Sequence, residues 1–174
     1  MKKNVIIFGL VLGTILSVPM LYMVTLCYTH PEWKGNDVVG YAAMVVVFSL
    51  IFFGVRNYRN KQLNGFISFG KAFRTGALIA LTGASLYVAV WLVAYYNFFP
   101  DFMDVYVPKA LNESAGNASA ADFAAKKEQL ETMREMYKNP LFVILFTYVE
   151  VLPIGLVVAL ISALALKKKN KTAI

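Results

Sequence analysis

Residues 141–166 read LFVILFTYVEVLPIGLVVALISALAL, an apolar run in which Glu150 is the one charged residue. Comparable runs without any charge lie at residues 4–28, 38–55 and 75–99. A helix rises about 1.5 Å per residue, so roughly 17 to 25 apolar residues cross the ~30 Å hydrocarbon core of a bilayer. Because backbone polar groups in lipid must be satisfied internally, the four runs predict helical spans and an all-α integral membrane four-helix bundle.

The composition agrees with one membrane domain over residues 1–174. Hydrophobic residues make up 59% of the chain and charged residues 16%, with a mean hydropathy of +0.59. The first run could alternatively be a secretory signal. Since residues 4–28 exceed the usual ~7 to 15 residue apolar region and lack a small-x-small cleavage site, we expect an uncleaved span.

Basic residues outside the runs are distributed unevenly. The segments before residue 4, between 56 and 74, and after 166 carry Lys and Arg but no acid, whereas 29–37 and 100–140 carry more acids than bases. By the positive-inside rule, this pattern predicts a multi-pass protein of the cell inner (cytoplasmic) membrane with both termini cytoplasmic. The bases lie beside spans, so the expected partners are anionic lipid headgroups of the cytoplasmic face and no nucleic acid.

The segment 100–140 contains the one sizeable extramembrane region. Residues 123–137 place Phe123, Leu130 and Met133 on one helical face, and Ser119 with Asp122 resembles a capping box before it. We therefore expect an extramembrane amphipathic helix between spans three and four, which could cap the bundle, lie on the bilayer or pair with a partner. Proline and glycine predict an irregular first half of the segment.

Small residues recur at intervals of four along three of the runs. Such stripes let helix backbones approach closely, either inside the bundle or in a homo-oligomer. The members are Gly9, Gly13 and Ser17 in the first run, Gly76, Ala80 and Ala84 in the third, and Gly155, Ala159 and Ala163 in the fourth.

Glu150 near mid-depth is the candidate intramembrane polar site. A carboxylate there is costly, so we expect it to be buried in the bundle, largely protonated, and hydrogen-bonded to a hydroxyl on another span. Pro153 frees the carbonyl of Val149 one turn away, because proline has no N–H. The polar residues at a similar depth that we select as candidate partners are Ser17, Tyr22, Ser85 and Tyr87.

Two functional interpretations of this site remain open. A protonated Glu150 that holds helices together indicates a non-enzymatic membrane protein acting through helix packing or contact with a membrane partner or second copy. A water-accessible Glu150 indicates proton-linked or small-solute transport.

Catalytic, cofactor and metal sites are not predicted. His30 is the one histidine and Cys27 the one cysteine, so clusters of imidazoles or thiolates cannot form. Residues 65–72, GFISFGKA, approach a phosphate-binding loop, but Ala72 replaces the hydroxyl residue that holds magnesium and no strand precedes them. We expect no enzyme.

Three stretches of the chain resemble the bacterial membrane family catalogued as domain of unknown function 4199. They are His30–Trp33 leading into Phe48–Tyr58, then Asn64–Phe73, and finally Glu150–Gly155. The resemblance implies a small four-span inner-membrane protein in which the Glu, Pro and Gly of span four recur. It implies no activity, substrate or cofactor.

The charge pattern predicts that Lys2 and Lys171 are cytoplasmic and Lys126 is outside. Single cysteines at these positions, in a chain whose Cys27 is replaced by Ala, should react with a membrane-impermeant reagent only at position 126 in intact cells. Labelling at position 171 but not at 126 would overturn the orientation.

Overall fold

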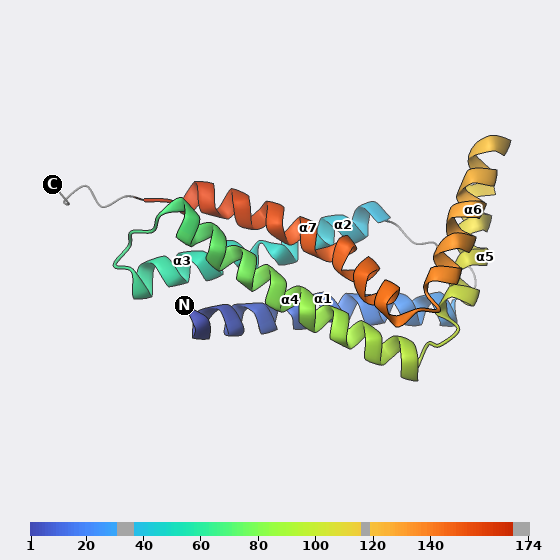
Figure 1. Ribbon diagram of the computed structural model, residues 1–174, viewed down its shortest axis with the longest axis horizontal. Helices are drawn as coiled ribbons and strands as arrows, with labels where there is room; N and C mark the ends of the chain where they lie inside the picture. Colours follow the sequence, from blue (N-terminus) through green and yellow to red (C-terminus); the bar gives the residue numbers. More distant parts are fainter. Residues whose placement is uncertain (31–36, 116–118, 169–174) are drawn as a thin grey trace.

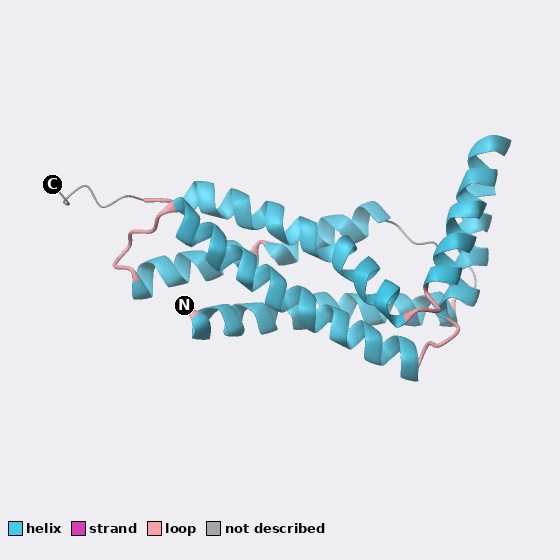
Figure 2. Ribbon diagram, viewed as in Figure 1, coloured by secondary structure: helices cyan, strands magenta, loops and turns pink. Residues whose placement is uncertain are grey.

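The computed structural model describes residues 1–30, 37–115 and 119–168, and these form seven α-helices. Their bounds are α1 Lys2–Thr29, α2 Asp37–Phe48, α3 Leu50–Gln62, α4 Phe69–Asn97, α5 Phe102–Ala115, α6 Ala120–Met136 and α7 Pro140–Leu166. Long apolar helices capable of crossing a membrane are Lys2–Thr29, Val38–Gln62, Phe69–Asn97 and Pro140–Leu166. The predicted four-span, all-helical architecture is therefore confirmed, and Figure 2 shows the long helices running along the bundle, with α5 and α6 at a steep angle to them.

The second span is interrupted at Ser49, whereas the sequence predicted one continuous helical span. Ser49 separates α2 from α3, and its hydroxyl donates to the carbonyl of Val46 at 2.6 Å. Serine hydroxyls that bond back to the preceding turn compete with regular helix hydrogen bonds. The span continues past the predicted end at Val55 as far as Gln62, so its basic end extends beyond the apolar run.

Helix α4 packs against both α1 and α7 (Figure 1). A β-carbon on Gly13 of α1 would lie 2.7 Å from the carbonyl oxygen of Gly83 in α4. On the other side, a β-carbon on Gly155 of α7 would lie 2.9 Å from that of Ala80. Helix backbones therefore approach closely at both contacts, and the predicted small-residue stripes are used within the bundle.

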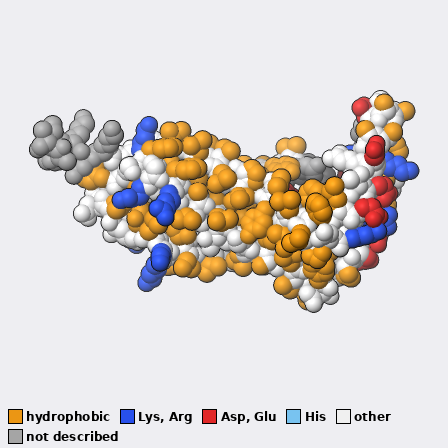
Figure 3. Space-filling model, in the orientation of Figure 1, with side chains coloured by type: hydrophobic (Ala, Val, Ile, Leu, Met, Phe, Trp, Pro, Cys, Tyr) orange, Lys and Arg blue, Asp and Glu red, His pale blue; other side chains and the backbone are white. Residues whose placement is uncertain are grey.

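Polar contacts join the helices at the end of the bundle where α1 begins and α7 ends (Figure 1). The Asn4 side-chain amide donates to the Gly54 carbonyl at 2.9 Å and accepts from Asn57 at 2.8 Å. Arg59 donates to the carbonyl of Leu166 at 3.2 Å, which satisfies an acceptor at the end of α7. Lys and Arg side chains gather at this end of the visible face, and acids gather over α5 and α6 at the other (Figure 3). We call the end with the Lys and Arg side chains the basic end.

Helices α5 and α6 form a hairpin at the other end of the bundle (Figure 1). The predicted amphipathic helix is confirmed as α6, with Ser119 accepting from the backbone N–H of Asp122 at 3.2 Å. The expectation that the preceding segment is irregular was wrong, because α5 continues through Pro108. Met103 and Val107 of α5 bury themselves against Leu130 of α6, and this packing outweighs the hydrogen bond that proline removes.

Gly13→Ala should destabilise the bundle, because the new methyl group would meet the α4 backbone and the side chain of Leu86. Overpacking of this kind costs about 1 to 3 kcal/mol. The control is Gly40→Ala, whose methyl group meets nothing within 4 Å and which should be neutral or stabilising by up to ~1 kcal/mol. Unfolding of both variants in detergent measures the difference. Equal stability of the two variants would contradict the close α1–α4 contact.

Candidate polar site around Glu150

Glu150 lies about 15 Å along α7 from its start at Pro140, and hence near the middle of a ~30 Å hydrocarbon core. Its side chain is exposed, so the expectation of burial inside the bundle was wrong. The helix turns a different row toward its neighbours, consisting of Val143, Thr147, Val151 and Gly155. Glu150 is adjacent to this row and therefore lies at the flank of the buried face.

Two phenols lie close enough to Glu150 for electrostatic interaction. Tyr87 of α4 is buried, with 6% of its surface exposed, and Tyr137 follows the end of α6. Burial, and then the charge of Glu150, raises the pKa of Tyr137. A tyrosine with an ordinary pKa of about 10 is already protonated at neutral pH, and the raised pKa of Tyr137 extends this state to higher pH. Among the four predicted hydroxyl partners, Tyr87 is therefore the one for which an electrostatic interaction with Glu150 is found.

The other predicted side chains have different positions. Ser17 is buried and donates to the carbonyl of Gly13 in its own helix at 2.7 Å. Tyr22 is 64% exposed, on the outside of the bundle. Ser85 donates to the carbonyl of Leu81 at 2.8 Å, again within its own helix. Pro153 is exposed on α7, one turn beyond Glu150, and the helix continues through it.

Two tyrosines that make contacts between helices were not selected from the sequence. The Tyr148 hydroxyl donates to that of Ser85 at 2.8 Å and joins α7 to α4, on a different side of α7 from Glu150. Tyr137 packs its ring against Tyr95 of α4 and Phe146 of α7. Tyr137 lies just before a span, where tyrosines are typical of interfacial belts, so its position alone carries no signal of an interhelical contact.

The arrangement places one carboxyl group at mid-depth on the flank of α7, within electrostatic range of the Tyr87 and Tyr137 phenols. On the outward side of α7, Val157 and Ile161 are 56% and 59% exposed. Helical spacing puts them on the same side of the helix as Glu150 and Pro153. We call this surface, made by Glu150, Pro153, Val157 and Ile161, the α7 outer face.

Tyr148→Phe should weaken the α4–α7 contact by about 0.6 kcal/mol and at most ~1.7 kcal/mol, the range for interhelical hydrogen bonds in bilayers. The substitution removes the donor to Ser85 and leaves the ring in place. Tyr22→Phe is the matched control, because Tyr22 is largely exposed and its loss of a hydroxyl should not alter stability. Both are measured as free energies of unfolding in bicelles. A Tyr148 variant as stable as the Tyr22 variant would argue against an interhelical bond.

Comparison with known proteins identifies the family of this chain but assigns no activity to it. No curated protein and no solved structure shows a significant match to the chain. Residues 7–168 match the family described as "Protein of unknown function (DUF4199)". This match covers nearly all of the chain, including most of the first span, the other three spans, α5, α6 and Glu150. The protein is therefore a member of the DUF4199 family, with four candidate membrane-spanning helices.

Proposed function

We propose that this protein is a non-enzymatic membrane protein that acts by binding a partner helix through the α7 outer face. The observation that supports this proposal most is the exposure of Glu150 at mid-depth on a helix of 27 residues that is otherwise free of charge. The occupant that fits is a transmembrane helix with a hydrogen-bond donor opposite Glu150.

The energetic argument starts from the cost of a carboxyl group in hydrocarbon. Insertion of a comparable Asp at the centre of a spanning helix costs about 3 kcal/mol. Contact with a polar side chain of a second helix reduces this cost, and interhelical hydrogen bonds contribute favourably in lipid. Around Glu150, the exposed apolar groups of Val157 and Ile161 provide surface for van der Waals packing of such a helix.

Transport centred on Glu150 is the alternative function. It requires water to reach the carboxyl group from at least one side of the membrane. Glu150 instead lies on the outer side of α7, exposed in line with Pro153, Val157 and Ile161. This position supports partner binding over transport.

We also propose that the basic end faces the cytoplasm and that the membrane is the bacterial inner membrane. Lys and Arg side chains gather at the end where α1 begins and α7 ends, and this distribution supports the proposed orientation (Figure 3). The α5–α6 hairpin then lies outside. Its acids, such as Asp104 and Glu131, pair with Arg134.

Photocrosslinking from the α7 outer face tests partner binding. A photoreactive residue at Val157 should crosslink in cells to a protein whose reacting peptide is a transmembrane segment bearing a polar donor. The control position is Val18 of α1, which is similarly exposed at 63% and should give lipid adducts only. Glu150→Leu should lower the crosslinking at Val157 about threefold or more, whereas Glu150→Gln should preserve it, since an amide keeps hydrogen-bonding capacity.

Equal crosslinking of the Glu150→Leu variant and the unsubstituted chain would contradict the proposal. A product with twice the mass of the chain would identify the partner as a second copy. In liposomes containing only this protein, a pH-dependent flux that disappears in Glu150→Gln would instead favour transport.

A further inference from the structure

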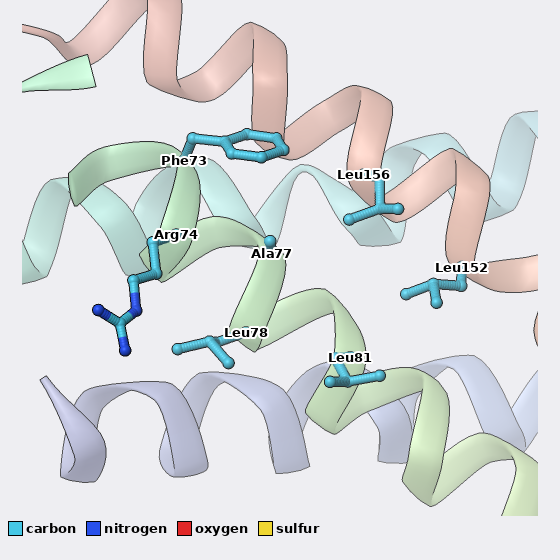
Figure 4. A pocket seen from close by; sticks show the side chains of 7 residues that line it. All are labelled: Phe73, Arg74, Ala77, Leu78, Leu81, Leu152 and Leu156. Atoms are coloured by element: carbon cyan, nitrogen blue, oxygen red, sulfur yellow. The ribbon is translucent and has the colours of Figure 1, made fainter. Parts of the chain in front are cut away.

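A groove of about 350 Å³ opens between α4 and α7, in the half of the bundle that lies toward the basic end (Figure 4). Phe73, Ala77 and Leu81 form its α4 wall at intervals of four residues. Leu152 and Leu156 form its α7 wall at the same interval. Residues four apart lie on one side of a helix, so each wall is a continuous apolar ridge.

The groove exists because small residues draw the two helices together along their inner faces. A β-carbon on Gly76 would lie 3.0 Å from that of Ala159, and Gly155 approaches Ala80 on the same side. Ala77 is adjacent to this contact, on the outward side, where its single methyl group leaves space between the larger side chains of Phe73 and Leu81. At this volume, the groove is at the small end of the ~300 to 1,000 Å³ range of ligand sites.

Arg74 is the one charged residue of the lining, and it is exposed. It belongs to the second turn of α4, close to the basic end, and its guanidinium points away from Phe73 (Figure 4). The helix rise places Arg74 about 10 Å from the level of Leu81. The groove therefore runs from a cation near the membrane surface into one leaflet, whose hydrocarbon is about 15 Å deep.

From this geometry we infer that the α4–α7 groove is a binding site for one anionic phospholipid of the leaflet at the basic end. An acyl chain lies between the ridges of α4 and α7, and the phosphate accepts hydrogen bonds from Arg74. A guanidinium suits this role because its planar fork binds phosphate oxygens in pairs. The apolar ridges select a lipid over free phosphate. This site is separate from the α7 outer face and does not depend on the partner proposed for Glu150.

Native mass spectrometry of the full chain in detergent tests the inference, with phosphatidylglycerol and phosphatidylcholine of identical acyl chains as probes. Phosphatidylglycerol should bind more tightly than phosphatidylcholine. Arg74→Gln should weaken it about fivefold, as expected for one basic residue at an anionic membrane surface, and abolish the preference. The matched control is Arg56→Gln, because Arg56 is also exposed near the basic end but does not line the groove.

Ala77→Phe fills the groove and should weaken the binding of both lipids, whereas Ala165→Phe, at an exposed position of α7 outside the groove, should not. If the Ala77 variant does not fold, Arg74→Gln still tests the inference, because Arg74 is exposed and its substitution should not disturb the fold. Millimolar inorganic phosphate should not displace the lipid. The inference would be overturned if the Arg56 and Arg74 variants lost affinity for phosphatidylglycerol equally. It would also be overturned if the unsubstituted chain bound the two lipids with equal affinity.

Discussion

The close approach of α4 to both α1 and α7 is the contact on which the rest of the structure depends. Lipid provides no hydrophobic force between helices, so association relies on van der Waals contact, and this requires small residues where backbones meet. Gly13 meets Gly83 on one side of α4, and Gly155 meets Ala80 on the other. The second contact fixes the rotation of α7 about its axis. It thereby turns Val151 inward, leaves Glu150 at the flank and opens the groove beside Ala77.

Different polar side chains connect the helices at the two ends of the bundle. At the basic end, amide contacts from Asn4 join α1 to α3, and Arg59 satisfies a carbonyl of α7. At the other end, the Lys109 ammonium donates to the carbonyls of Cys27 and His30, where the α1 macrodipole favours a cation. These contacts hold α5 against the end of α1, while apolar packing along α4 determines the centre of the bundle.

The sequence predicted the features that the bilayer imposes and missed those that depend on helix rotation. Run length and the absence of charge identify spans, and stripes such as Gly155, Ala159 and Ala163 identify packing faces. The exposure of Glu150 could not be predicted, because α7 is apolar all around and its hydropathy does not reveal which side faces α4. The continuity of α5 through Pro108 was missed for a related reason, since it depends on tertiary packing against Leu130.

Spin-label accessibility at two adjacent positions of α7 tests the orientation of this helix most directly. Labels at Glu150→Cys and Val151→Cys, in a chain whose Cys27 is replaced by Ala, are compared in bilayers for collision with dissolved oxygen and with a water-soluble nickel chelate. We expect oxygen to reach position 150, neither reagent to reach position 151, and the nickel chelate to reach neither position. The described orientation of α7 would be contradicted if position 150 were shielded from oxygen while position 151 was accessible, or if the nickel chelate reached position 150.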